Sequence, residues 1–348
     1  MKGKPKFKKQ KMMNRVLYAL TPALLGSIYF FGWRCFVMLL FVCAVGCATE
    51  FYMAKRRNDP LTAACLVTCF LFALSLPPTT PFWIAAVGTV VALLFGKEVF
   101  GGFGRNVFNP AIVGRGFVYV CFPNALTACF TPVWKGGLGG FAHWGPQTTV
   151  DGINAVSSAT PMWSNRDFGF TAQLTDLFTG NIGEVFESSD GVTRVLGAGS
   201  MGEVSALLIL IGGIYLLWTK TANWRLVVSP ILGATFFVLI FRNLLGFEQI
   251  PPVPWTLCSG AMLFASFFMT TDPVSAPKHK TSQFWYGAFI GIMIVFLRWK
   301  AVFAGGVAFA ILLGNTVAPT LDMIFKALEK RKKEKAKIKS AEVNNAAV

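Results

Sequence analysis

The run Cys35-Phe-Val-Met-Leu-Leu-Phe-Val-Cys-Ala-Val-Gly-Cys-Ala-Thr-Glu-Phe-Tyr-Met53 decides the fold class of this chain. It holds a single charged residue, Glu50, and its length is close to the ~20 helical residues that cross the hydrocarbon core of a bilayer. Similar runs recur along the 348 residues, of which 54% are apolar and 14% charged, and the mean hydropathy is +0.56. This composition predicts an all-α polytopic membrane protein embedded in a lipid bilayer.

The apolar runs predict about ten transmembrane helices, arranged as two halves of five. A basic N-terminus, residues 1–13, precedes the first half, residues 14–123. A long polar loop, residues 124–202, leads to the second half, residues 203–325, and a charged tail, residues 326–348, follows. The predicted spans are residues 14–31, 35–53, 61–76, 81–95, 111–122, 203–218, 225–241, 255–269, 285–297 and 302–325.

The basic residues set the predicted orientation of these spans. The net charge of +16 would suggest nucleic acid as the partner of a soluble protein, but no nucleic-acid motif occurs. Lysines and arginines instead gather in both termini and in alternate loops, so the positive-inside rule places both termini in the cytoplasm and the long polar loop outside. The predicted outer link that holds Arg298 and Lys300 is the exception.

A weak internal repeat suggests that the two halves are inverted relative to each other. Phe72 to Pro81 resembles Phe264 to Pro273, and Asn109-Pro110 resembles the stretch from Asn315 to Pro319. A half with an odd number of spans ends on the opposite side of the membrane from where it began. The second half therefore enters the membrane inverted, as in many transporters. The alternative is that these segments are ordinary loop turns with a chance similarity.

Three acidic residues lie within or beside the apolar spans, namely Glu50, Glu203 and Asp322. A carboxylate within hydrocarbon costs ~2.5–3.5 kcal/mol on insertion scales, so such residues normally face a partner or a path for ions. We therefore consider all three for a cation path. The alternatives are that Glu50 and Asp322 reach the membrane interface and that Glu203 stabilises a helix N-terminus.

Other common catalytic patterns are missing from the sequence. The eight cysteines include no Cys-x-x-Cys pair, and His143 and His279 have no evident ligand partner, so a metal site held by this chain alone is not expected. The segment from Gly101 to Asn106 is glycine-rich but lacks the Lys-Ser/Thr of a phosphate-binding loop. Arg105 and Arg115 could pair with a phosphate or a carboxylate, or serve as interfacial anchors.

The polar loop contains one hydroxyl surrounded by small residues. Thr160 follows Ser157, Ser158 and Ala159 in the stretch that begins at Asp151. Small neighbours leave such a hydroxyl accessible to a modifying enzyme. Clusters of this composition are also common in ordinary solvated loops, so the pattern alone does not establish a modification site.

Three motifs, in the same order, resemble the NqrB/RnfD family of membrane subunits. They are Lys97-Glu-Val-Phe-Gly-Gly-Phe-Gly-Arg-Asn-Val-Phe-Asn-Pro-Ala111, Gly202-Glu-Val-Ser205 and Met269-Thr-Thr-Asp-Pro-Val-Ser-Ala276. The family carries flavin mononucleotide, FMN, joined through its phosphate to the threonine of a Ser-Gly-Ala-Thr motif. The resemblance implies that Thr160 is this threonine, with Ser158 in place of the glycine, and that a flavin transferase acts on it outside the cytoplasm.

The resemblance also implies roles for further residues. It associates Glu50, Glu203 and Asp322 with the cation path and Gly46 with the quinone region. Asp151, Ser157, Ser158, Ala159, Arg105 and Arg115 become candidates for binding the flavin. A non-covalent riboflavin also occurs in the family, but the sequence assigns no residue to it.

The resulting expectation is a multi-pass protein of the bacterial inner membrane that carries electrons and couples their flow to Na⁺ or H⁺ transport. It would act only within a complex of membrane and peripheral subunits, as the RnfD component of an Rnf complex. One alternative is the NqrB component of the Na⁺-translocating NADH:quinone reductase. A solute channel or transporter of the same inverted fold, and a scaffold with a dead flavin site, are alternatives from other classes.

Overall fold

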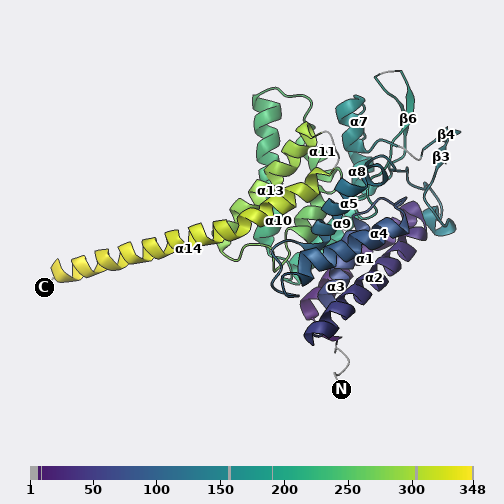
Figure 1. The fold of residues 1–348 in the computed structure, drawn as a ribbon. Coiled ribbons are helices and arrows are strands. Elements are labelled where there is room, and N and C mark those ends of the chain that lie inside the picture. The colour runs from purple at the N-terminus through teal and green to yellow at the C-terminus, as the bar shows by residue number, and fades with distance from the viewer. Residues whose placement is uncertain (1–6, 9, 156–157, 190, 302–304, 347–348) are drawn as a thin grey trace.

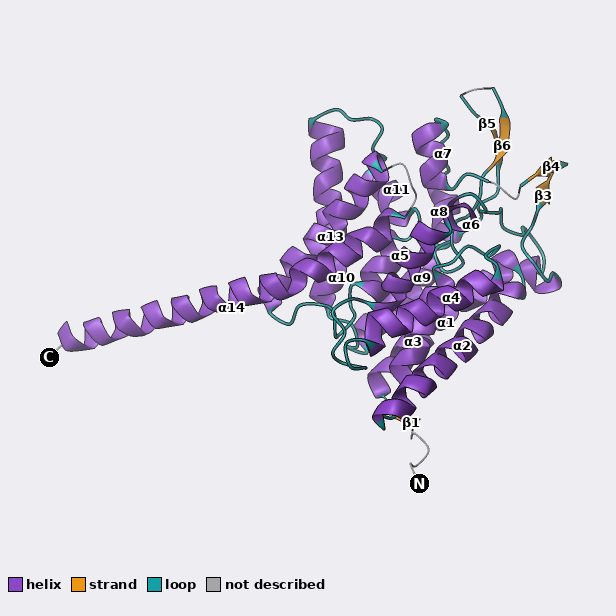
Figure 2. Ribbon diagram, in the orientation of Figure 1, coloured by secondary structure: helices purple, strands orange, loops and turns teal. Residues whose placement is uncertain are grey.

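The protein is a helical bundle with an irregular polar loop at one end, as seen in a computed structural model (Figure 1). The structure describes residues 7–8, 10–155, 158–189, 191–301 and 305–346, with side chains described up to residue 338. Helices dominate these residues, and strands occur there only as three small two-stranded sheets (Figure 2). The C-terminal helix projects away from the bundle (Figure 1).

The part of the chain before the polar loop forms helices that pack side by side. Helix α2 packs against α3 and α4, α1 packs against α3 and the later helix α9, and α4 packs against α5. The elements are β1 (Phe7–Lys8), α1 (Lys11–Phe31), α2 (Arg34–Arg57), β2 (Leu61–Thr62), α3 (Ala63–Leu74), α4 (Phe82–Leu93), the π-helical turn η1 (Leu94–Glu98) and α5 (Pro110–Cys121). Strands β1 and β2 pair in parallel.

The polar loop contains only short elements. It is tied to the start of α2, because Trp33 and Arg34 donate their amides to the carbonyls of His143 and Trp144 at 3.2 and 2.7 Å. Its elements are α6 (Pro123–Thr127), the 3₁₀ turn η2 (Gly139–Ala142), β3 (Thr149–Val150), β4 (Ile153–Asn154), α7 (Pro161–Asp167), α8 (Leu174–Thr179), β5 (Val185–Glu187) and β6 (Thr193–Val195). We call this side of the bundle the loop end.

The second part of the chain is built around the close pair α10 and α13, and α14 packs against α13. Its elements are α9 (Ala206–Trp218), α10 (Trp224–Val238), the π-helical turn η3 (Leu239–Leu244), α11 (Val253–Cys258), α12 (Met262–Phe264), the π-helical turn η4 (Ala265–Met269), α13 (Lys280–Lys300) and α14 (Gly306–Ala346). The basic tail is thus a continuation of α14, exposed to solvent as far as residue 338.

Each of the ten predicted spans is helical over most of its length, and four helices in the described ranges are both long and apolar enough to cross a membrane. These are Arg34–Arg57, Trp224–Leu244, Lys280–Lys300 and Gly306–Ile338, and shorter apolar helices are Ala63–Leu74, Pro110–Cys121 and Ala206–Trp218. The protein is therefore a helical membrane protein. The full count of ten spans stays a prediction.

Two predicted boundaries were wrong. The predicted span 255–269 is not one helix, because the chain breaks between α11 and α12, where Gly260 takes a φ of +56° that favours glycine. The predicted link around Arg298 and Lys300 is helical, since α13 continues through both residues.

Asn109 joins segments from the two predicted halves of the chain. Its backbone amide donates to Asn315 Oδ1 at 3.2 Å, and its side-chain amide donates to the carbonyl of Met269 at 3.1 Å. The same side chain caps α5 by accepting from the amide of Ala111. Asn315 in turn donates to the hydroxyl of Tyr286 at 2.9 Å. The segments of the predicted repeat therefore meet, while their inverted symmetry stays a prediction.

Replacing Asn109 with alanine removes the donor to Met269 and the cap of α5 together. We expect the variant to lose about 1–3 kcal/mol of unfolding free energy, because a buried carbonyl is left without a partner. Thermal unfolding of the detergent-solubilised protein measures the loss. Asn165→Ala is the matched control, since its amide donates to the exposed hydroxyl of Thr171, and equal stability losses in both variants would contradict the central role of Asn109.

Candidate functional site

Thr160 follows an extended segment that is held on both sides by other parts of the loop. The amide of Ser158 donates to the carbonyl of Phe130 at 3.0 Å, and the amide of Gly197 donates to the carbonyl of Ala159 at 2.8 Å. Gly197 permits this close approach, because a Cβ there would lie 2.9 Å from the Cβ of Ser158. The position of Thr160 is thus set by backbone bonds rather than left to a free loop.

The other loop residues of the predicted flavin motif differ in their placement. Ser158 is buried, its hydroxyl donates to the carbonyl of Ala155 at 2.8 Å, and it is not among the described residues with positive φ, so its position does not require glycine. Ala159 is buried beside it. Asp151 is exposed in the turn between β3 and β4, and Ser157 lies outside the described residues.

The side chain of Thr160 lines a cavity of about 340 Å³ at the loop end. Thr160 precedes α7, but its hydroxyl makes no capping hydrogen bond to that helix, so the oxygen is not used by the helix start. The cavity wall is largely apolar, with Tyr119, Phe130 and Trp163 among its residues. Its charged residues are Arg115, Arg166, Glu203 and Arg298. The volume lies within the ~300–1,000 Å³ typical of small-molecule sites.

Arg115 and Glu203 form a buried ion pair in the wall of this cavity. Arg115 Nη1 lies 2.6 Å from Glu203 Oε1, and Arg115 Nη2 donates to Ser200 Oγ at 3.3 Å. The exposed fractions of the two residues are only 8% and 6%. The turn that carries Glu203 is fixed on the end of α3, because the amides of Met201 and Gly202 donate to the carbonyls of Leu76 and Leu74. Tertiary contacts therefore bring together two residues that the sequence predicted separately.

Glu203 does not begin a helix, contrary to one alternative from the sequence. Helix α9 starts at Ala206, and its cap is Ser205, whose side chain accepts from the amide of Leu208. Glu203 lies before this helix rather than in its first turn, and its partner is Arg115.

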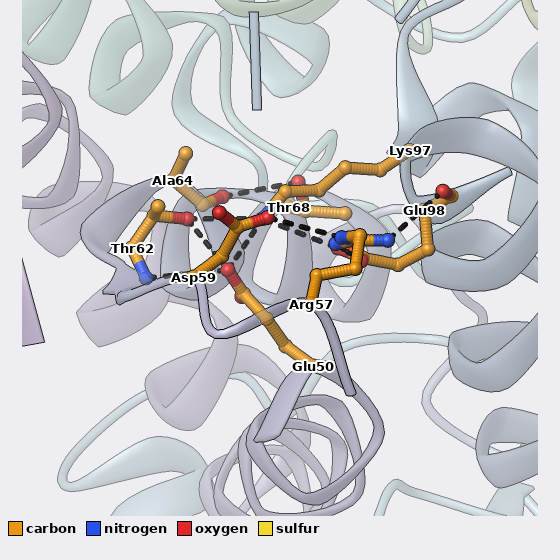
Figure 3. A network of polar contacts seen from close by, with 8 residues as sticks. All are labelled: Glu50, Arg57, Asp59, Thr62, Ala64, Thr68, Lys97 and Glu98. Atoms are coloured by element: carbon orange, nitrogen blue, oxygen red, sulfur yellow. Dashed lines mark hydrogen bonds and ion pairs between the residues drawn. The ribbon is translucent and has the colours of Figure 1, made fainter. Parts of the chain in front are cut away.

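Glu50 belongs to a second charged cluster, near the C-terminal end of α2 (Figure 3). Lys97 Nζ lies 2.7 Å from Glu50 Oε1 and 2.9 Å from Thr62 Oγ1, and the Thr62 hydroxyl donates to the same carboxylate oxygen at 2.8 Å. Lys97 is also 4.0 Å from Glu98, which pairs with Arg57. Glu50 is therefore a buried carboxylate paired with Lys97, a cation that sequence reasoning did not single out. Its depth relative to the membrane interface stays a prediction.

The remaining predicted residues lie elsewhere. Arg105 lines a cavity beside Glu50, Asp59 and Glu98, so among the two predicted arginines only Arg115 borders Thr160. Asp322 is half-buried on α14 and accepts the amides of Lys278 and His279 at 3.0 and 3.1 Å. The three acids of the predicted cation path thus occupy three separate places.

Gly46 lies where α2 packs closely on α3 and α4. A Cβ at this position would contact the thiol of Cys69 and the side chains of Leu93 and Thr89. The glycine therefore has a packing role in this chain, and its association with a quinone stays a prediction.

Sequence reasoning missed Arg166 and Arg298 as residues of the Thr160 cavity. Arg166 lies on α7, outside all three family motifs, and it pairs with Asp167 at 2.7 Å. The sequence did contain a sign of Arg298, because it lies in the predicted outer link that departs from the positive-inside rule. Of the two residues of that exception, Arg298 lines the Thr160 cavity at the loop end and Lys300 does not.

The fold and the cavity define a class of protein: a helical membrane protein with a threonine hydroxyl placed in a charged pocket at one end. The chain belongs to the NQR2, RnfD, RnfE family, whose model matches residues 4–330. It is 32% identical over 337 residues to the D subunit of the ion-translocating oxidoreductase complex of Shewanella amazonensis, covering 90% of this chain and 92% of the relative.

Relatives of a second kind are equally similar in sequence. The B subunit of the Na⁺-translocating NADH-quinone reductase of Azotobacter vinelandii is 35% identical over 322 residues, covering 88% of this chain and 72% of the relative. The corresponding protein of Haemophilus influenzae is 34% identical over 313 residues, covering 86% and 67%. The resemblance drawn from the three sequence motifs is therefore confirmed at the level of the family.

Lys97→Met should destabilise the protein by about 3–5 kcal/mol, because Glu50 would be left buried without its cation. The double variant Glu50→Gln, Lys97→Met should recover most of this loss, since it removes both charges. Denaturation of the detergent-solubilised protein measures the unfolding free energies.

Lys326→Met provides the control, because Lys326 is exposed and lies 3.7 Å from Asp322 in a pair expected to contribute less than about 1 kcal/mol. If the double variant has the same unfolding free energy as Lys97→Met alone, Glu50 and Lys97 are not energetically coupled and the prediction is contradicted.

Proposed function

We propose that this chain is the membrane-embedded electron-transfer subunit of an ion-translocating oxidoreductase complex, of the RnfD type, with FMN joined covalently to Thr160. The observation that carries the proposal is the hydroxyl of Thr160, held by backbone bonds in the wall of a cavity that also presents arginine side chains. A channel for solutes has no need of this combination. The relatives' names, which refer to ion-translocating oxidoreductases, support the proposal.

The residues around Thr160 fit a flavin nucleotide. The largely apolar wall suits the planar ring system, and the arginines suit a phosphate, which guanidinium groups recognise well. The volume of about 340 Å³ suits a group of this size, and Thr160 is 9% exposed, so its hydroxyl is reached through the cavity. FMN bound here would accept and donate electrons one or two at a time.

The chain's own residues would hold this group rather than react with it. Thr160 would supply the oxygen of a phosphoester bond. The backbone hydrogen bonds of Ser158 and Ala159 would keep that oxygen at the cavity wall. Glu203 holds the Arg115 guanidinium in place, and Ser200 accepts its second bond. The pair is neutral overall, so it fixes the direction of the guanidinium N–H donors without adding net charge to the cavity.

Glu50 and Glu203 are the stronger candidates for a cation path for Na⁺ or H⁺. Each is buried, and each has a cationic partner whose displacement would leave the carboxylate free to bind a cation. In addition, Oε2 of Glu50 is buried without a hydrogen-bond partner among the described residues. Asp322 is retained as a weaker candidate, because backbone amides already occupy both of its oxygens. The riboflavin of the family is not assigned to residues here.

The proposed setting is the bacterial inner membrane, with both termini in the cytoplasm and the Thr160 cavity on the outer side, where a flavin transferase would act. Electrons would come from partner subunits of the complex. The NqrB component of a Na⁺-translocating NADH:quinone reductase is the alternative within the family, supported by relatives of similar identity. Purifying the tagged chain and identifying its partners by mass spectrometry distinguishes the two complexes.

Thr160→Ala should abolish covalent flavin on this chain. The measurement is in-gel flavin fluorescence of the denatured protein, co-expressed with its flavin transferase and compared with wild type. Thr127→Ala is the matched control, because Thr127 lines the same cavity but its hydroxyl donates to the carbonyl of Pro123, and we expect its fluorescence to equal that of wild type.

A wild-type chain without fluorescence, beside a control protein that the same transferase has modified, would overturn the covalent-flavin proposal. A solute channel or transporter, or a scaffold protein, would then be the better explanation of the fold.

A further inference from the structure

The charged residues of the Thr160 cavity do not balance. Arg115 is neutralised by Glu203 and Arg166 by Asp167. The hydrogen bond from Arg166 lowers the pKa of the Asp167 carboxyl, so this carboxylate is ionised at neutral pH. Arg298, by contrast, has no ion pair with a carboxylate in the described part of the chain. The cavity wall therefore carries one surplus positive charge.

Arg298 is held rigidly in this wall. It lies near the end of α13 and donates to the carbonyls of Thr256 and Ser259 at 3.2 and 3.1 Å, two groups beside the break between α11 and α12. Gly260 lies against it, since a Cβ at Gly260 would be 3.2 Å from Arg298 Nη2. The guanidinium is thus held against the helix break, and Arg298 as a whole is half-buried.

The segment that carries Thr160 docks beside the same break. Met162, two residues after Thr160, accepts a hydrogen bond from the hydroxyl of Ser259 at 3.1 Å. Arg166, at the other end of α7, donates to the carbonyl of Ala301, just beyond α13. Contacts at both ends of α7 therefore keep Thr160 and Arg298 on one cavity.

Satisfying two carbonyls does not explain the charge of Arg298. A neutral glutamine amide could donate to both, whereas an arginine has five N–H donors and a permanent charge. Glu203 and Arg115 are close enough to influence this charge, but their effects oppose each other because the two are already paired. A cation in a poorly solvated cavity is costly unless an anion offsets it.

We infer that Arg298 is the counter-cation for an anionic group of the ligand attached at Thr160. This inference rests on the proposed flavin function. Two groups of FMN share the required chemistry: the phosphate, which keeps one negative charge as a diester, and the ring, which gains negative charge when it is reduced. Arg298 stabilises either of them by Coulomb attraction in a site of low polarity.

The test compares Arg298→Gln, which keeps hydrogen-bond donors but removes the charge, with Arg298→Lys, which keeps the charge. Both are measured in the purified whole complex as the yield of covalent flavin and the midpoint potential of that flavin. Lys300→Gln is the matched control, because it removes an exposed charge two residues away whose side chain lies over Trp299 instead of in the cavity.

If Arg298 faces the ring, Arg298→Gln should lower the preference for reduced over oxidised flavin at least tenfold, which for a one-electron couple equals about 59 mV. Arg298→Lys and Lys300→Gln should leave the potential near that of wild type.

If Arg298 faces the phosphate, Arg298→Gln should leave the flavin potential unchanged. Binding of free FMN then reports the loss, measured in complexes that carry Thr160→Ala and so cannot attach it covalently. Adding Arg298→Gln to Thr160→Ala should weaken FMN binding at least tenfold and leave riboflavin binding unaffected.

The inference is overturned if Arg298→Gln retains both the wild-type potential and the wild-type preference for FMN over riboflavin. It is equally overturned if the glutamine and lysine variants lose flavin to the same extent while the remaining flavin keeps its potential, since that result indicates a structural role at the helix break. Absence of flavin from the wild-type chain is a different result, because it removes the proposed function itself.

Discussion

Every backbone carbonyl that a helix break leaves inside a membrane protein needs a hydrogen-bond donor, because lipid supplies none. Polar side chains from distant segments meet this need here. Arg34 donates to carbonyls of the turn between α3 and α4, including that of Thr80 at 2.6 Å. Asn109 donates to Met269 at the end of η4, and Arg298 donates to two carbonyls at the end of α11, where the break before α12 begins. These bonds fix the relative positions of the helices around them.

The two charged sites of the molecule lie beside such interruptions. The Thr160 cavity borders the Gly260 break, and the Glu50 cluster lies where α4 passes through the π-helical turn η1 into a glycine-rich loop. Interrupted helices leave room for side chains to converge from several elements, which a continuous helix does not. The same interruptions thus make the bundle harder to stabilise and give it sites able to hold charge.

The buried ion pairs of these sites position groups more than they stabilise the fold. Taking Arg115 and Glu203, or Lys97 and Glu50, out of water costs about as much as their mutual attraction returns. Their value to the proposed function is that each carboxylate is held at a known place by a partner on another element. A change of charge in the Thr160 cavity would act first on the pair formed by Arg115 and Glu203, because that pair shares the cavity wall.

The sequence by itself determined the helical membrane class, the approximate positions of the long apolar helices and the family, because apolar runs and motifs are local patterns. It also singled out Thr160, Arg115 and Glu203. Only the tertiary structure decided that these three residues share one cavity with Arg298, and that Arg105 lines a different one. It also decided that Lys97 pairs with Glu50. The physical reason is that such contacts join residues as far apart as Arg115 and Glu203, 88 positions along the chain, and only helix packing sets which of them meet.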